Sequence, residues 1–191
     1  KRYCLFASQF LPHTGGAERY TYNLAKKLIE RGNQVTVVTS NVGDYADFER
    51  MDGIRVYRIP AWCFMNGRFP VMKPTRKFFR MHQSIFYDRY DVFIIQTRFY
   101  FHSLYGMLMA KVQKVVCVTI DHGTGHMLTG NKLADKIGEV YEHLLTKVET
   151  CFCDRFYGVS NESVKWLKHF GIDAKGVMYN SVDYDGIMEI Y

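Results

Sequence analysis

The chain has 191 residues, which is the length of a single domain. Hydrophobic residues make up 48% and charged residues 23%, a globular balance that excludes disordered and collagen-like chains. The 25 Lys and Arg against 19 Asp and Glu leave a formal charge of +6, which favours an anionic partner such as a phosphate, a nucleic acid or an acidic lipid surface. No apolar segment approaches the roughly 18 residues that a transmembrane helix needs, so none is expected.

Short apolar runs alternate with longer stretches of helical periodicity along the whole chain. Strands are expected over residues 3–8, 35–39, 54–59 (ended by the proline at position 60), 91–96, 115–120, 156–160 and 177–180. Helices are expected over residues 17–31, 75–90, 101–112, 133–148 and 161–170, and residues 61–74 have the composition of a loop. Strands that are apolar on both faces and alternate with helices are typical of covered parallel sheets. The sequence therefore predicts an α/β fold with a Rossmann-like, doubly wound parallel sheet.

The cysteines favour a reduced, cytoplasmic protein. They are five in number and scattered, and no C-x-x-C motif occurs among them. Cys4 and Cys117 fall in expected buried strands, where a free thiol acts as a small hydrophobic group. Cys151 and Cys153 have the spacing of a strand, could face the same way, and are expected to be structural.

The loop after the first strand carries two adjacent glycines, Gly15 and Gly16. In doubly wound sheets ligands bind beyond the carboxyl ends of the strands. Adjacent glycines let a ligand approach the N–H groups at the positive end of a helix, which suits a diphosphate. A tight strand–helix turn explains the same pair without a ligand, because neither a dinucleotide fingerprint nor a P-loop is present. Glu18, in the first helical turn, complements the helix dipole.

A histidine, His122, directly follows the apolar strand expected over residues 115–120. At that position it can reach a ligand as a hydrogen-bond partner or proton shuttle, or it is simply a structural loop residue. His126 lies four residues further on, but Gly123 and Gly125 disfavour the helix that such a metal-binding pair requires. No metal site is therefore expected.

A basic segment between positions 68 and 80 includes Arg76, Lys77 and Arg80, interleaved with phenylalanines. This composition suits contact with an anionic membrane surface. An ordinary helix that buries its phenylalanines and leaves its charges in water explains it equally. No nucleic-acid-binding motif accompanies the charge, so nucleic acid is not an expected partner.

Several segments together resemble glycosyltransferase family 4. They are the glycine loop FLPHTGGAE (residues 10–18), residues 23–25, 31–39 and 53–60, the Asp-His-Gly at 121–123, and residues 158–160, 170–172 and 179–183. The resemblance implies a GT-B fold, in which two Rossmann-like domains face each other across a cleft. Residues 1–183 would be the N-terminal, acceptor-side domain and residues 184–191 the start of the interdomain hinge. The donor-binding C-terminal domain would be absent, so the isolated domain is expected to be inactive.

The resemblance also implies a reaction and roles for particular residues. The reaction is transfer of a sugar, with retention, from a nucleotide-diphosphate sugar to a hydroxyl acceptor, in the synthesis of a polysaccharide, glycolipid or other glycoconjugate, without a metal or other cofactor. His122 matches the family histidine that reaches the transferred sugar and is the expected catalytic residue. Gly15 and Gly16 match the loop that closes over the donor diphosphate. The expected neighbours on the acceptor or sugar side are Thr14, Glu18 and Arg98.

Two other functions fit the same sequence. One is a non-catalytic Rossmann-like module that binds a membrane or a partner through its basic segment. The other is a GT-B epimerase that acts on a nucleotide sugar. In each case the expected location is cytoplasmic, with peripheral contact at the inner face of the membrane if Arg76, Lys77 and Arg80 touch lipid.

Overall fold

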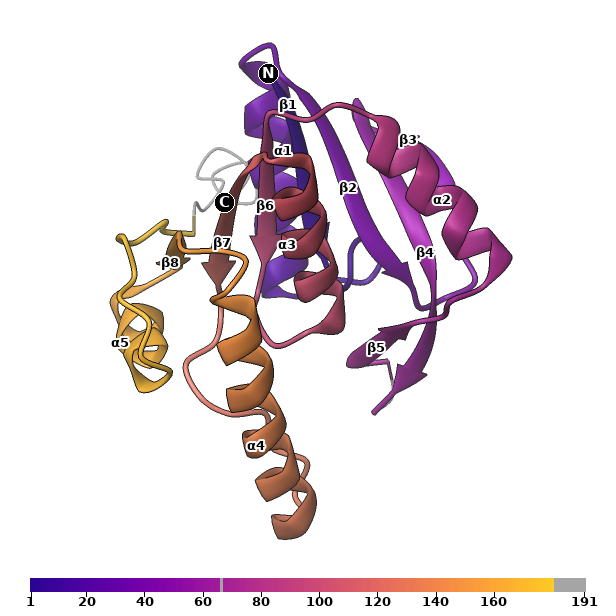
Figure 1. Cartoon of the computed structure of the whole chain (residues 1–191). Coiled ribbons are helices and arrows are strands. Elements are labelled where there is room, and N and C mark those ends of the chain that lie inside the picture. The colour runs from indigo at the N-terminus through magenta and orange to yellow at the C-terminus, as the bar shows by residue number, and fades with distance from the viewer. Residues whose placement is uncertain (66, 181–191) are drawn as a thin grey trace, which may run out of the picture.

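The computed structural model describes residues 1–65 and 67–180. Its centre is an eight-stranded sheet with the order β3-β4-β2-β1-β6-β7-β8, in which β5 pairs with β4 (Figure 1). The strands are β1 (Arg2–Ala7), β2 (Gln34–Asn41), β3 (Phe48–Met51), β4 (Ile54–Phe64), β5 (Phe69–Met72), β6 (Val92–Gln96), β7 (Val116–Asp121) and β8 (Phe156–Gly158). The helices are α1 (Gly16–Glu30), α2 (Arg76–Tyr87), α3 (Phe101–Gln113), α4 (Lys132–Glu149) and α5 (Asn161–His169).

The path of the chain explains how the helices are distributed over the sheet. It starts in the middle at β1, moves outward through α1 to β2 and β4, and then crosses back through α2 to β6 and β7. These strands are parallel, and right-handed connections therefore place α1 on one face and α2, α3 and α4 on the other (Figure 1). The expected doubly wound sheet is confirmed, and the strand order reverses between β1 and β6. Ligands bind at the carboxyl ends of strands at such a reversal.

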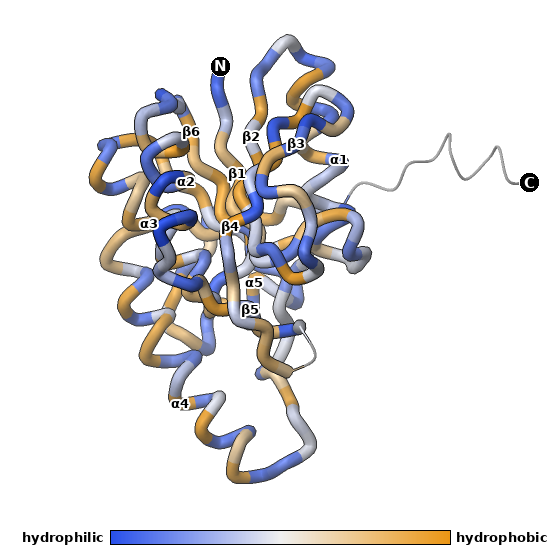
Figure 2. Tube along the Cα trace, turned by 90° about the vertical axis from the view of Figure 1, so that its right-hand side faces the viewer, coloured by the Kyte–Doolittle hydropathy of each residue, from blue (hydrophilic) through white to orange (hydrophobic). Residues whose placement is uncertain are grey.

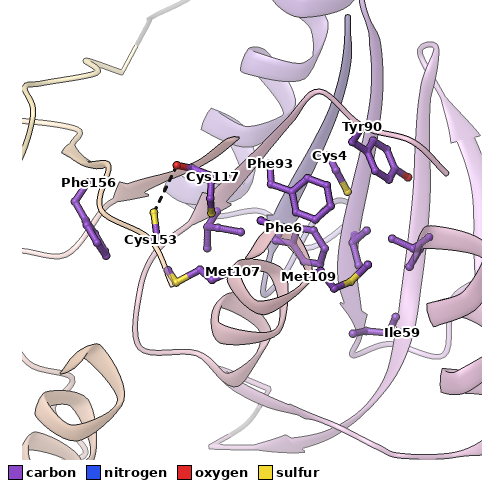
Figure 3. Close-up of a cluster of buried hydrophobic side chains, with 14 of the residues drawn as sticks. Cys4, Phe6, Ile59, Tyr90, Phe93, Met107, Met109, Cys117, Cys153 and Phe156 are labelled. Atoms are coloured by element: carbon purple, nitrogen blue, oxygen red, sulfur yellow. Dashed lines mark hydrogen bonds between the residues drawn. The ribbon is translucent and has the colours of Figure 1, made fainter. Parts of the chain in front are cut away.

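Each face of the sheet has its own hydrophobic core, because successive strand residues point to opposite sides. Cys4 and Phe6 of β1 join the cluster beneath α2 and α3 (Figure 3), whereas Leu5 joins the cluster beneath α1. Hydrophobic residues accordingly gather along the central strands in Figure 2. Gly106 lets α3 approach the sheet closely, since a Cβ atom there would lie 2.6 Å from the Phe6 ring.

The segment expected to be a loop at residues 61–74 is wrong in part, because β4 runs on to Phe64 and pairs with β5. Pro60 does not end the strand. It lies where β4 changes partner: it is the last residue opposite β2, and from Ala61 onward β4 pairs with β5. Proline is tolerated at such a position because no ladder hydrogen bond from its nitrogen is needed there. The two strands that the sequence missed, β3 and β5, are four-residue antiparallel partners of β4.

Two smaller expectations are also corrected. Cys151 and Cys153 do not lie in a strand but in the turn after α4, where Cys151 is exposed and Cys153 is buried. The Cys153 thiol donates to the carbonyl of Cys117 (Figure 3), and all five cysteines are free. The strand expected at 177–180 is a single parallel bridge between Gly158 and Val177.

Neither the hinge expected at residues 184–191 nor the last three residues of the expected domain, 181–183, belongs to the described part of the chain. Among the helices of the described part, none combines the length and apolar character required to cross a bilayer.

Candidate functional site

The two glycines at the start of α1 have different structural reasons. Gly15 is the N-cap residue, and a Cβ atom there would lie 2.4 Å from the Glu18 carboxylate oxygen Oε2. Gly16 opens the helix with nothing within 4 Å of the place where its Cβ would be. Gly15 is therefore required by the Glu18 side chain, which folds back over the helix start. Gly16, in contrast, faces open space from which a ligand can approach the backbone.

Glu18 is buried, and its Oε1 lies 3.4 Å from Nδ1 of His13. A carboxylate in the first turn is stabilised by the positive end of the helix dipole. Thr14, next to the glycines, is exposed. The structure thus gives Glu18 a local structural explanation, and its expected role beside the sugar stays a prediction, as does that of Thr14.

His122 follows β7 and is held by two contacts from different elements. Its Nε2 lies 2.8 Å from Oε1 of Gln96, the last residue of β6, and the Tyr20 ring of α1 meets it edge-on with 5.0 Å between ring centroids. Oε1 can only accept, so Nε2 donates and the lone pair is on Nδ1. Burial lowers the pKa of His122 to about 4, so the ring is neutral near pH 7. A neutral, oriented imidazole can hydrogen-bond a sugar hydroxyl.

The same contacts bring the glycine loop and the histidine to one edge of the sheet. Tyr20 lies one helical turn after Gly16, and it touches His122 at the end of β7. Tyr100, which follows β6, lies near the helix start, since burial and the nearby Glu18 charge both raise its pKa. The helix start and the histidine therefore border the carboxyl ends of β1, β6 and β7, where a doubly wound sheet binds its ligand.

Arg98 is buried in an ionic network and does not face solvent. Only 1% of it is exposed, and its Nη1 donates to Oε1 of Glu142 at 2.7 Å and to Oγ1 of Thr146 at 3.2 Å. Its Nε lies 3.5 Å from Oδ2 of Asp121, and its guanidinium carbon lies 3.7 Å from the centre of the Phe170 ring. This geometry assigns Arg98 a structural role and offers no support for its expected position beside the sugar.

The buried network holds more carboxyl groups than arginines. Burial raises the pKa of Asp121, and it raises the pKa of Glu149 to about 8. Glu149 is therefore mostly protonated near pH 7, which reduces the negative charge around Arg98.

This network turns α4 inside out. Its buried residues are mostly polar: Glu142, Leu145, Thr146 and Glu149. The apolar residues of the helix are exposed: Leu133, Ile137, Val140, Leu144 and Val148. The sequence predicts the helix correctly, but the face that it buries is the one that surrounds Arg98.

The basic segment forms α2, with Thr75 as its N-cap. Met81 and Ile85 pack against the sheet, as in an ordinary amphipathic helix. On its outer side Arg76 and Arg80 are exposed, together with Phe79 at 55% and Tyr87 at 78%. Lys77 is exposed as well, with its Nζ 2.6 Å from Oδ1 of Asp47. Contact with a membrane stays a prediction.

The sequence did not predict a cluster of three histidines, His126, His143 and His169. They come from the loop after β7, from α4 and from α5. No motif signals them, because the cluster forms only when α4 and α5 fold against that loop.

The described residues form a Rossmann-like α/β domain with polar groups gathered at the carboxyl ends of its central strands, a class of domain that binds phosphate-bearing ligands. The sequence pattern of Glycosyltransferase Family 4 matches residues 14–185, and the chain belongs to this family. The resemblance noted from the sequence is confirmed.

Proteins similar to the chain agree with this assignment. An uncharacterized glycosyltransferase of Methanocaldococcus jannaschii is 27% identical over 193 residues, covering 97% of this chain and 49% of the relative. The human phosphatidylinositol N-acetylglucosaminyltransferase contains a polypeptide that is 27% identical over 125 residues, covering 54% of this chain and 25% of the relative. The chain thus spans half or less of the length of these relatives.

A solved structure shows the same fold. Sucrose-phosphate synthase from Thermosynechococcus elongatus superposes with a TM-score of 0.64 at 14% sequence identity, covering 94% of this chain and 47% of that chain. The described domain is therefore Rossmann-like in the manner of one half of a GT-B glycosyltransferase.

Proposed function

We propose that this chain is the acceptor-side half of a retaining glycosyltransferase, which moves a sugar from a nucleotide-diphosphate donor to a hydroxyl group. The observation that carries the proposal is the contact between Tyr20 of α1 and His122, because it joins the helix start to the end of β7. Residues 1–183 would form this half and residues 184–191 would begin the hinge to a donor-binding domain. A relative about twice as long supports this division.

The chemistry of the transfer fits the two parts of the site. Negative charge grows on the leaving diphosphate, and the N-terminus of α1 at Gly16 offers backbone N–H groups and a positive dipole end. Positive charge grows on the sugar ring, which a neutral His122 tolerates and an imidazolium would oppose. These groups replace a metal ion in the proposed mechanism, so we expect transfer to keep its rate without added Mg²⁺ or Mn²⁺.

The experiment that tests the function is an assay of the whole protein with a panel of nucleotide-diphosphate sugars. The name of the human relative places an N-acetylglucosaminyl donor and a phosphatidylinositol acceptor first in the panel. Release of nucleoside diphosphate together with a glycosylated acceptor of unchanged anomeric configuration is expected. An inverted product would refute retention, and a free or isomerised sugar would favour the epimerase.

Substitution of Gly16 tests whether a ligand uses the open space at the helix start. We expect Gly16→Ala to raise the donor KM at least about 10-fold, because a methyl group would stand between the donor phosphate and the backbone. Its folding should not suffer, since nothing lies within 4 Å of the new Cβ. Steady-state kinetics of the whole protein and thermal unfolding measure the two effects.

The matched control for this substitution is Gly138→Ala in α4. Gly138 also has nothing within 4 Å of its Cβ position, and alanine in a helix interior stabilises by roughly 0.5–1 kcal/mol relative to glycine. An unchanged donor KM is expected for Gly138→Ala. Equal KM values for both variants would refute diphosphate binding at Gly16.

A second function, peripheral contact with an anionic membrane, is favoured by the outer side of α2. Each Lys or Arg near such a surface contributes about 1 kcal/mol. We therefore expect the triple variant Arg76→Glu, Lys77→Glu and Arg80→Glu to lower partitioning onto anionic vesicles at least about 100-fold. Co-sedimentation measures it. The control reverses Lys26, Lys27 and Arg31 at α1, on the opposite face of the sheet; equal binding of the two variants would exclude α2 as the contact.

A further inference from the structure

Three histidine rings converge at a place that the proposed transfer does not use. Each of His126, His143 and His169 offers a ring nitrogen, and these nitrogens all lie within 4.8 Å of one another. The Nε2 atoms of His143 and His169 are 3.2 Å apart. The ring centroids are 4.9–5.5 Å apart.

Glu142 orients one ring of this cluster. Its Oε2 accepts from Nδ1 of His126 at 2.5 Å, and its Oε1 is held by Arg98 at 2.7 Å. A carboxylate on Nδ1 fixes the proton there and leaves the lone pair of Nε2 for another partner. Histidines that bind metal ions are almost always oriented in this way.

We propose that His126, His143 and His169 bind a divalent transition-metal ion of the zinc class, which joins α5 to α4 and to the loop after β7. Two imidazole nitrogens that each lie about 2.0–2.1 Å from a tetrahedral Zn²⁺ are roughly 3.3–3.4 Å apart. The measured 3.2 Å between His143 and His169 is close to this value. Imidazole ligands suit zinc, nickel and copper, whereas magnesium prefers oxygen.

The site is independent of the proposed transfer. Its ligands come from the loop after β7, α4 and α5, whereas the diphosphate is assigned to the start of α1. With three protein ligands, a tetrahedral ion keeps a fourth position for water or another ligand. The bound ion would stabilise the fold, because the three ligands are brought together only in the folded chain.

Aromatic packing is the competing explanation of the cluster. The Trp166 and His169 rings stack at 4.8 Å with 7° between their planes, and the Phe170 ring lies 4.7 Å from that of His143. Packing alone predicts that no metal ion binds at these rings. Calorimetric titration with Zn²⁺ and the visible spectrum of bound Co²⁺ therefore distinguish the two explanations.

The titrations use the full chain with the two exposed thiols replaced, Cys63→Ser and Cys151→Ser, so that thiolates do not bind the ion. We expect one ion per chain, an absorption spectrum of tetrahedral, nitrogen-ligated Co²⁺, and a higher melting temperature with Zn²⁺. His143→Gln and His169→Gln should each raise the Kd for Zn²⁺ at least about 10-fold.

The matched control is His82→Gln, which removes an imidazole from α2, where Nδ1 of His82 lies 2.8 Å from the Tyr105 hydroxyl. Its Kd for Zn²⁺ should equal that of the parent. Absence of saturable binding overturns the proposal, and an equal Kd in the His143 and His169 variants shows an adventitious ion only. The Co²⁺ spectrum of the parent needs no variant, so a spectrum without nitrogen ligands overturns the proposal even if a variant does not fold.

Discussion

Replacing Arg98 by methionine should lower the free energy of unfolding by about 3–5 kcal/mol, the cost of removing one partner from a buried ionic network. The guanidinium pairs with Glu142 and lies beside Asp121, and both carboxyl groups are buried. Methionine has a similar length and fills much of the space, so the loss reports the missing charge more than a cavity. Urea denaturation at pH 7 measures it.

The pH dependence of this loss has a definite sign. Glu149 has a pKa raised to about 8, so in the folded state it binds a proton that the unfolded chain gives up near pH 4.5. Its neutral form is favoured at low pH, and the stability that it preserves is lost as the pH rises through 8. Without the Arg98 charge the ionised forms of Glu149 and Asp121 are less stable still. The destabilisation caused by Arg98→Met should therefore be larger at pH 8 than at pH 5.

The control for Arg98 is Arg155→Met. The Arg155 side chain is 51% exposed, and its Nε lies 4.0 Å from Oδ1 of Asp154, so it should contribute no more than about 1 kcal/mol. If Arg98→Met cost as little as this control, the buried network would not hold α4 on the sheet. The arginine would then be free for another role.

How far the sequence predicts this fold depends on what each helix buries. The apolar face of α1 packs on the sheet through Ala25 and its neighbours, so periodicity predicts both the helix and its orientation. In α4 the same kind of periodicity predicts the helix but not its buried face. The polar residues Glu142 and Thr146 turn inward because Arg98, more than 40 residues earlier, is buried beneath them.

The candidate site divides in the same way. Gly16 and His122 follow strands, and a rule about strand ends is enough to place both at one edge of the sheet. The contacts that fix the His122 ring come from Tyr20 and Gln96, and neither residue carries a motif. The histidine cluster lay beyond prediction for a similar reason, since α5 meets α4 only in the folded chain.

The buried network also positions the candidate catalytic residue. The backbone N–H of Arg98 donates to Oδ1 of Asp121 at 3.3 Å, and Asp121 immediately precedes His122. Gln96 then holds the ring itself. The end of β7 is thus fixed on two sides before any substrate binds, and this rigidity is what an oriented hydrogen bond in a transition state requires.

His122→Ala should lower kcat of the whole protein at least about 100-fold, the usual cost of losing one oriented hydrogen bond to a transition state. Donor KM should change much less, because the proposed diphosphate contacts are at Gly16. Burial lowers the pKa of His122 to about 4, so its protonation should not shape the pH–rate profile between pH 6 and 8. A proton shuttle would instead produce an ionisation in that range.

The variants that surround this one separate chemistry from folding. His122→Gln keeps a polar side chain beside Gln96 and should fold if the alanine variant does not, yet it cannot present an imidazole nitrogen at the same place. His82→Ala removes a half-buried ring from α2 and should leave kcat unchanged. Should both His122 variants fold and turn over within about 3-fold of the parent, the loss would be below about 0.7 kcal/mol. A value that small would exclude His122 from the transition state and leave the glycine loop without its catalytic partner.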